Sequence, residues 1–371
     1  MTNILEKYAH LLVNYCLEVS PGDRVLVRTT SQAEPLLAHL LRAVLKAGGS
    51  MEVLWEFQGQ KRILLTEGND FALEEIPPAY KEAIEAYECL LTIMAPHNLA
   101  SDHNLDAEKV KKRQKALSPY SKKYVERTGT RALRRSLCLF PTTANAQLAG
   151  MSLEEYEHFV YSACKLYEDD PVASWKEVGK QQQKIVDFLN KKEHIHYLGE
   201  NVDLQFKTKG RTWINSDGKT NMPSGEVYTS PEEDSVNGHI HYSFPGIYRG
   251  QNVEGVTLWV KNGYIEKWEA KSGQSFLDEI FSIPGTRRFG EAAIGTNYNI
   301  QRSTKNILFD EKIGGSVHMA IGQSYQQAGG KNTSTVHWDM ITDMTKDGAI
   351  FADGEKIYEK GRFSSEIVDN F

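Results

Sequence analysis

The segment from residue 24 to residue 55 constrains the fold most, because two short apolar runs flank a stretch with helical spacing. The apolar runs cover residues 24–28 and 51–55, and leucine and valine recur at helical spacing over residues 36–45. Two consecutive glycines then end the expected helix. A strand, a helix and a second strand in this order predict a parallel pair with a right-handed crossover. The N-terminal region is therefore expected to belong to the α/β class.

Two further apolar runs are predicted to add strands to this parallel sheet. They cover residues 90–94 and 136–140 and have the length and composition of strands. The turn after the first strand, residues 29–35, contains no glycine. A dinucleotide site needs glycines at this place to let the backbone approach a phosphate. We therefore expect the N-terminal region to be a scaffold and not a cofactor site.

The character of the sequence changes near residue 190. Helical spacing runs over residues 153–189 with a break at 169–171, whereas short alternating strands separated by Gly, Asn and Asp turns follow. Strands are expected at residues 194–198, 202–206, 256–260 and 264–268. We predict two domains, an N-terminal α/β domain with a parallel sheet over residues 1–190 and a C-terminal mixed α+β domain over residues 191–371.

The charge balance argues against a polyanionic partner. The 371 residues contain 43 Lys and Arg against 49 Asp and Glu, which gives a net charge of −6 with neutral histidine. A chain of this charge has no general attraction to nucleic acid or to anionic lipid. The basic run over residues 108–135 is compatible with RNA binding, but its helical spacing favours a solvated helix face. We therefore expect no nucleic-acid partner.

Cysteine usage and hydropathy predict a cytoplasmic protein. Cys16, Cys89, Cys138 and Cys164 are far apart and show no metal-ligand spacing, so they are expected to be reduced thiols. The N-terminal residues lack the continuous apolar core of a signal peptide. The sequence contains no run of about 18 apolar residues, so no membrane span is expected.

Histidines and a carboxylate on predicted strands are the first candidates for chemistry. His337 and Asp339 are two residues apart, so their side chains point to the same face of a strand while Val336 and Trp338 face the core. His318 lies between apolar neighbours in another predicted strand. A rigid sheet that presents such groups from one face is suited to hold a ligand.

Further candidates are weaker when taken singly. Glu226 and Glu291 each follow a glycine, and Tyr325 lies in the turn after the strand that carries His318. Two other pairs, His194 with His196 and His239 with His241, have the same spacing as His337 and Asp339. These two pairs could be ligands too, but we interpret them as the polar face of a strand, because no glycine-flanked carboxylate can be assigned to them.

Several separate segments together resemble the M29 family of metallo-aminopeptidases, which includes the aminopeptidase T and aminopeptidase S types. They occur in the same order as in the family and extend the resemblance over nearly the whole chain. The segments are residues 140–142, 149–156, 213–219, 225–235 and 290–297. The resemblance implies a peptide hydrolase that acts on substrates with a free N-terminus.

The same resemblance implies a co-catalytic pair of divalent metals in the C-terminal domain and a homodimer. The family's ligand pattern matches Glu226, Glu291, His318, His337 and Asp339, and Tyr325 stands at the place of a tyrosine thought to act in catalysis. The stretch between the two histidines is shorter than in some members. This difference predicts a change in the loop that shapes the substrate pocket.

The charges of these ligands are consistent with two divalent metals. Three carboxylates and one hydroxide carry four negative charges, two divalent cations carry four positive charges, and the two imidazoles are neutral. Mixed oxygen and nitrogen ligands suit zinc or cobalt, and also manganese. We expect a hydroxide bridging two metals to attack the peptide carbonyl.

Two residues are assigned to catalysis in addition to the metals. Tyr325 is expected to donate a hydrogen bond to the oxyanion, and Glu291 is either a ligand or also the proton shuttle to the leaving amine. The alternative is a catalytically inactive aminopeptidase-like scaffold or binding protein. The presence of all five ligand residues argues against this alternative, because clustered carboxylates are costly to desolvate without a metal.

Overall fold

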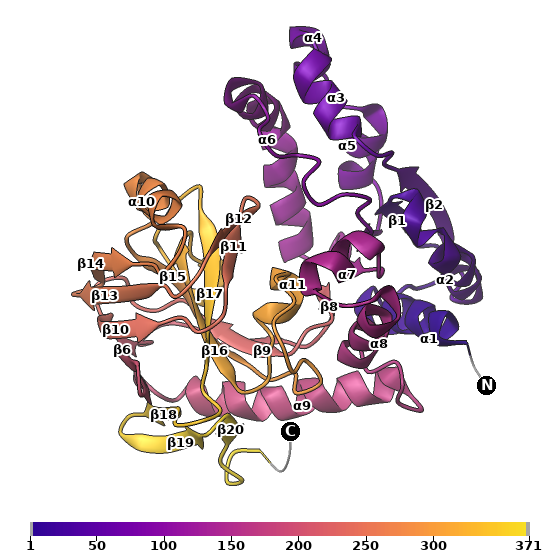
Figure 1. Cartoon of the computed structure of the whole chain (residues 1–371). Helices are drawn as coiled ribbons and strands as arrows, with labels where there is room; N and C mark the ends of the chain where they lie inside the picture. The colour runs from indigo at the N-terminus through magenta and orange to yellow at the C-terminus, as the bar shows by residue number, and fades with distance from the viewer. Residues whose placement is uncertain (1–2, 369–371) are drawn as a thin grey trace. The chain divides into compact units, whose positions relative to one another are not determined.

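The computed structural model describes residues 3–368 and contains two compact units (Figure 1). The first unit covers the chain up to Val172 together with Gly218–Pro223. The second covers Ala173–Asp217 and the chain from Ser224 onward. Each unit is therefore built from two separate stretches of sequence, whereas the ranges predicted for the domains, 1–190 and 191–371, are continuous.

The first unit contains a five-stranded sheet in which all strands are parallel. The strand order is β2-β1-β3-β4-β8. The strands are β1 (Arg24–Thr29), β2 (Ser50–Trp55), β3 (Cys89–Met94), β4 (Arg134–Leu139) and β8 (Asn221–Met222). Helix α2 (Glu34–Lys46) connects β1 to its neighbour β2, so the predicted strand–helix–strand unit is confirmed.

The helices of the first unit lie before, between and after the strands β1 to β4 in the sequence. They are α1 (Ile4–Leu11), a π-helical turn (Leu12–Cys16), α2, α3 (Gln60–Glu67), α4 (Asp70–Glu74), α5 (Pro78–Glu85), α6 (Ala107–Gly129), α7 (Thr143–Ala149) and α8 (Leu153–Ala163). All four cysteines are buried, and none of them forms a disulfide bond. Within residues 3–368, no helix combines the length and apolar character needed to cross a membrane.

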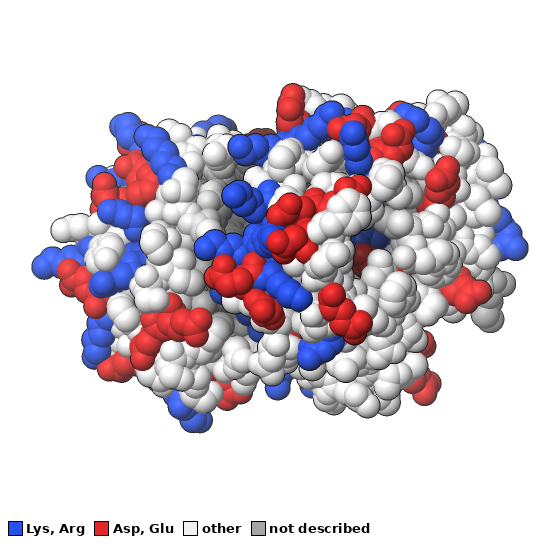
Figure 2. Space-filling view, turned by 90° about the horizontal axis from the view of Figure 1, so that it is seen from above, with Lys and Arg blue, Asp and Glu red and all other residues white. Residues whose placement is uncertain are grey.

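Helix α6 contains most of the basic run and has no buried residue, as expected for a solvated face. Its lysines form ion pairs with acidic residues of α4 and α5, for example Lys112 with Asp70 and Lys123 with Glu85. Arg134 lies on strand β4 instead of on the helix. On the face drawn in Figure 2, basic and acidic side chains alternate over the surface, and no separate basic patch stands out.

The second unit contains two larger antiparallel sheets and one short hairpin. The eight-stranded sheet has the order β14-β13-β10-β6-β5-β18-β19-β20, and the five-stranded sheet has the order β17-β16-β15-β9-β7. The first of these sheets comprises β5 (His194–Gly199), β6 (Val202–Lys207), β10 (Asn237–His241), β13 (Thr257–Lys261), β14 (Tyr264–Glu269), β18 (Ala349–Ala352), β19 (Glu355–Glu359) and β20 (Arg362–Phe363). The other comprises β7 (Ile214–Ser216), β9 (Glu226–Thr229), β15 (Phe289–Gly295), β16 (Ser316–Gly322) and β17 (His337–Asp343). The hairpin is β11 (Gly246–Tyr248) with β12 (Gln251–Val253), and the helices are α9 (Pro171–Leu189), α10 (Gln274–Ser282) and α11 (Ile307–Asp310).

One hydrophobic core joins the two antiparallel sheets of the second unit. Tyr197 and Leu204 enter it from the eight-stranded sheet, and Val317, Met319 and Ile321 enter it from β16. Because side chains alternate along a strand, one face of the five-stranded sheet is filled by this core. The other face of the same sheet is therefore available for polar side chains.

Removing side-chain volume from this core should destabilise the second unit. Ile321→Ala deletes a buried side chain on β16, so the free energy of unfolding should fall by about 2–5 kcal/mol. Urea unfolding followed by tryptophan fluorescence measures this loss, because five of the six tryptophans lie in the second unit. Glu266→Ala changes an exposed residue of β14 and serves as the control, with an expected change within about 0.5 kcal/mol. Equal unfolding midpoints for the two variants would contradict the assigned core.

Candidate metal centre

Four adjacent strands place the five predicted ligands on one face of the five-stranded sheet. Glu226 lies on β9, Glu291 on β15, His318 on β16, and His337 and Asp339 on β17. They share the face opposite to the hydrophobic core, since their strand neighbours, such as Val317 and Trp338, belong to that core. The predicted orientation of the β17 side chains is therefore confirmed.

Small residues occupy the positions between these ligands. In the sheet register, Ala320 lies between Glu291 and Asp339, and Ala293 is the β15 partner of His318. An alanine projects only a methyl group from the sheet. The ligand side chains can therefore lean toward one another over the shortened neighbours and converge on a common space.

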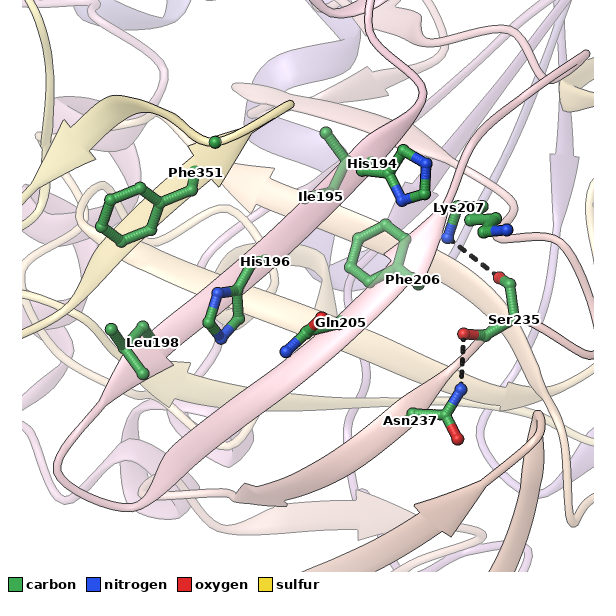
Figure 3. A pocket seen from close by; sticks show the side chains of 11 residues that line it. His194, Ile195, His196, Leu198, Gln205, Phe206, Lys207, Ser235, Asn237 and Phe351 are labelled. Atoms are coloured by element: carbon green, nitrogen blue, oxygen red, sulfur yellow. Dashed lines mark hydrogen bonds between the residues drawn. The ribbon is translucent and has the colours of Figure 1, made fainter.

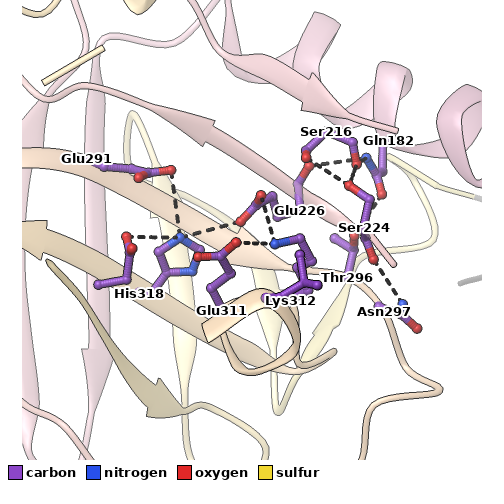
Figure 4. A network of polar contacts seen from close by, with 12 residues as sticks. Gln182, Ser216, Ser224, Glu226, Glu291, Thr296, Asn297, Glu311, Lys312 and His318 are labelled. Carbon is purple, nitrogen blue, oxygen red and sulfur yellow. Dashed lines mark hydrogen bonds and ion pairs between the residues drawn. The ribbon is translucent and has the colours of Figure 1, made fainter. Parts of the chain in front are cut away.

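The ligands converge in two groups that share one carboxylate. Glu226, Glu291 and His318 form the first group, and Glu291, His337 and Asp339 form the second. Nε2 of His318 lies 3.5 Å from Oε2 of Glu226 and 3.7 Å from Oε1 of Glu291 (Figure 4). Nε2 of His337 lies 3.1 Å from Oε2 of Glu291 and 3.5 Å from Oδ1 of Asp339. Each group offers oxygen and nitrogen atoms within reach of a single cation.

Buried atoms of this cluster lack hydrogen-bond partners, as expected for metal ligands. Four of the five residues expose only 1–8% of their surface, namely Glu226, Glu291, His318 and Asp339. Both ring nitrogens of His318 and Oδ1 of Asp339 are buried and form no hydrogen bond. Buried polar atoms without partners are costly. Divalent cations would satisfy Nε2 of His318 and Oδ1 of Asp339, so the residues present fit a metal site of mixed oxygen and nitrogen donors.

A backbone carbonyl orients the imidazole of His337. Its Nδ1 lies 2.7 Å from the carbonyl oxygen of Gln323, which accepts a hydrogen bond when this nitrogen carries the proton. In that tautomer, Nε2 presents its lone pair toward Glu291 and Asp339. Metal-binding histidines commonly have such a partner on the second nitrogen.

The three carboxylates shift the pKa values of the two imidazoles strongly. Burial alone would lower the pKa of His318, but Glu291, Glu226 and Asp339 raise it to about 9. Burial opposes protonation of His337 as well, yet Asp339 and Glu291 raise its pKa to about 12. In the absence of a cation, protons on the imidazoles would compensate the carboxylates.

Tyr325 lies at the edge of the cluster, half-buried, with its hydroxyl 3.5 Å from Nε2 of His337. Its ring contacts the ring of Tyr228 at a centroid distance of 5.1 Å. The negative charge of Glu291, together with burial, raises the pKa of Tyr325 far above its usual value. The phenol therefore keeps its proton and can donate a hydrogen bond at neutral pH.

No sequence pattern indicated that Gln182, Glu311 and Lys312 would lie near Glu226. Nε2 of Gln182, on α9, donates a hydrogen bond to the backbone carbonyl of Glu226 at 3.1 Å. Nζ of Lys312 lies 3.7 Å from Oε1 of Glu226, and Lys312 also forms an ion pair with Glu311 (Figure 4). Charged residues ahead of two glycines are typical of an exposed turn, so the sequence offered no signal that Lys312 would be buried.

The two remaining histidine pairs lie elsewhere, on the eight-stranded sheet. Nε2 of His196 pairs with Oδ1 of Asp203 at 2.8 Å, and Nδ1 of His241 lies 2.8 Å from the hydroxyl of Thr257. His194 and His196 line an open pocket of about 580 Å³ (Figure 3). None of the predicted ligands lines this pocket.

A buried cluster of carboxylates and imidazoles on one sheet face is suited to bind metal ions, and comparisons with known proteins identify the family of the chain. The family model described as thermophilic metalloprotease (M29) matches residues 1–363. Aminopeptidase PepS of Streptococcus thermophilus is 30% identical over 95% of each chain, and Aminopeptidase 2 of Geobacillus stearothermophilus is 26% identical over 98% of each chain. The chain belongs to the M29 family of metallopeptidases.

The fold agrees with this assignment. The structure of wild-type AmpT from Thermus thermophilus matches with a TM-score of 0.83 at 24% sequence identity, covering 97% of this chain and 98% of that one. The protein is thus a peptide hydrolase of a metallo-aminopeptidase family, with a parallel-sheet α/β unit and a mixed α+β unit as predicted. The inactive-scaffold alternative is not favoured, because the named relatives are aminopeptidases.

Metal binding should release protons, because the raised pKa values leave both imidazoles protonated in the metal-free protein. Zinc added to metal-free protein at pH 7.5 should release at least two protons per chain, one from each imidazole, and affinity for the cation should rise with pH. A pH indicator in weak buffer measures the release. His337→Ala should release about one proton fewer, whereas His239→Ala on the eight-stranded sheet should match the wild type. Zinc binding without proton release would contradict the assigned charge states.

Proposed function

We propose that the protein removes N-terminal residues from peptides with a free N-terminus, using two divalent cations held by the cluster on β9, β15, β16 and β17. The observation that carries this proposal is the pair of ligand groups that share Glu291. The mixed donors favour zinc or cobalt, with manganese as a further fit. Cytoplasmic location stays a prediction from the sequence, and assembly as a homodimer stays a prediction that the family resemblance implies.

Each of the five ligand residues has a defined role in the proposal. Glu226 and His318 would hold one cation, His337 and Asp339 would hold the other, and Glu291, which belongs to both groups, would serve both. When bound, such a pair supplies a hydroxide at neutral pH and polarises a carbonyl group. Three carboxylates together with one hydroxide balance the four positive charges, so the loaded site is neutral. A neutral site avoids the cost of an uncompensated charge on a buried sheet face.

Two residues are assigned to the chemical step, one to stabilise the oxyanion and one to transfer a proton. The hydroxyl of Tyr325, which stays protonated, donates a hydrogen bond to the oxyanion of the tetrahedral intermediate. We assign to Glu291 the transfer of a proton from the attacking water to the leaving amine, because this carboxylate belongs to both groups. An exopeptidase must in addition bind the free α-amine of its substrate.

The dependence on metal and on the free amine tests the proposed function. Dialysis against a strong chelator should abolish hydrolysis of a short peptide, and zinc or cobalt should restore it. Acetylation of the peptide's N-terminus should abolish cleavage, because a site built to bind the amine is left with an unpaired group. Release of the N-terminal amino acid, measured by chromatography, reports both results.

Two outcomes would contradict this function. Full activity in chelator would show that no metal acts in the reaction. Equal cleavage of free and acetylated peptides would show an endopeptidase or another hydrolase. His239→Ala lies outside the cluster and controls for nonspecific effects of substitution, since it should leave both results unchanged.

Tyr325→Phe separates catalysis from metal binding. The variant keeps the aromatic ring and its packing against Tyr228 but loses one hydrogen-bond donor. Turnover should fall by about 10²- to 10³-fold, while the Michaelis constant and the metal content stay near the wild-type values. Tyr264→Phe, which removes an exposed hydroxyl from β14, is the matched control. Loss of metal in Tyr325→Phe would make Tyr325 a ligand, and turnover within a few-fold of wild type would refute its catalytic role.

A further inference from the structure

A buried ion pair lies directly beside the candidate metal centre. Lys312 has no exposed surface, and its ammonium group forms ion pairs with two carboxylates. These partners are Glu311, the neighbouring residue, and Oε1 of Glu226 at 3.7 Å. A buried lysine is costly unless its charge is compensated. The two carboxylates provide this compensation.

Backbone contacts fix Lys312 next to Glu226. The backbone N–H of Asn297 donates to the carbonyl of Lys312 at 3.0 Å, and the side-chain amide of Asn297 donates to the carbonyl of Ser224 at 2.9 Å. Gly295, the β15 partner of Glu226, allows the close approach, since a Cβ there would lie 2.2 Å from the carbonyl oxygen of Ile313. The chain around Lys312 is thus attached to the strands that carry the ligands.

The two oxygens of Glu226 have different surroundings. Oε2 lies 3.5 Å from Nε2 of His318 and faces the ligand group, whereas Oε1 faces the ammonium group of Lys312 (Figure 4). By contrast, Glu291 directs its two oxygens at the two different histidines. Glu226 is therefore held so that one oxygen remains for a cation, while both oxygens of Glu291 face the site.

We propose that Lys312 is a positioning residue that holds Oε1 of Glu226 and so presents Oε2 as a single-oxygen ligand to one of the two cations. Glu311 supplies the charge that makes this arrangement possible. Lys312 alone would add a positive charge close to two divalent cations and weaken their binding. The ion pair with Glu311 is the contact that offsets this positive charge.

The proposal rests on the two-metal function and predicts that the two cation positions respond differently. Lys312→Met removes the group that orients Glu226, which belongs to the first ligand group only. Affinity for the cation bound by Glu226 and His318 should fall by about 10- to 100-fold, the usual effect of losing a partner of a metal ligand. Affinity for the cation bound by His337 and Asp339 should change by less than about threefold.

Cobalt titration of the metal-free full-length protein measures both affinities. The visible absorption of Co²⁺ reports ligand number and geometry, and equilibrium dialysis counts the ions bound per chain. Wild-type protein should bind two Co²⁺, and Lys312→Met should keep one tight site and one weakened site. Lys305→Met changes an exposed lysine on the other side of α11, so it is the control and should bind like the wild type.

A double variant separates the effect of Lys312 on the orientation of Glu226 from the effect of its charge. It also guards against misfolding. Lys312→Met with Glu311→Gln removes the whole ion pair, a change that buried pairs often tolerate. If Lys312 positions Glu226, the first site should stay weakened although the charge is balanced again. Two unaltered sites in Lys312→Met, or full recovery in the double variant, would overturn the positioning role. Fewer than two Co²⁺ on the wild type would instead overturn the two-metal function itself.

Discussion

Electrostatic compensation on one buried sheet face is the constraint on which the second unit depends. Glu226, Glu291 and Asp339 lie within reach of the same two imidazoles, and their surroundings exclude water. Like charges at such distances cannot all be ionised without nearby positive charge. Cations, imidazolium groups and Lys312 are the available sources. The raised pKa values of the histidines and the unpaired atoms of His318 and Asp339 both follow from this constraint.

The five-stranded sheet satisfies this constraint without weakening the core. Alternation along each strand sends one set of side chains into the hydrophobic core and the other set to the ligand face. Strand β16 illustrates the arrangement, because Val317 and Met319 pack in the core on either side of His318. The packing that holds the sheet rigid therefore also holds the ligands, which suits a metal site that must keep its geometry without a flexible support.

Local patterns predicted much of the fold, whereas contacts between distant residues did not follow from them. The β1–α2–β2 unit and the shared face of His337 and Asp339 depend on periodicity within a few residues, and the structure contains both. Glu226 and Glu291 could be assigned only through the resemblance to the M29 family, because sheet register brings them to the histidines. Strand order in an antiparallel sheet depends on loops and packing that no local window contains. Lys312 was missed for the same reason, since it is buried among residues distant in sequence, such as Glu226, and its loop approaches Gly295 closely.

The division of the second unit into two stretches of sequence has a consequence for its expression as a separate protein. Its chain leaves at Asp217, contributes strand β8 to the parallel sheet of the first unit, and returns at Ser224, two residues before Glu226. A gene that starts at Ala173 would encode both stretches of the second unit, but it would also encode strand β8, which would then lack the parallel sheet that it joins. A truncated gene that starts after residue 223 would encode all five ligands but lack Gln182, β5, β6 and β7.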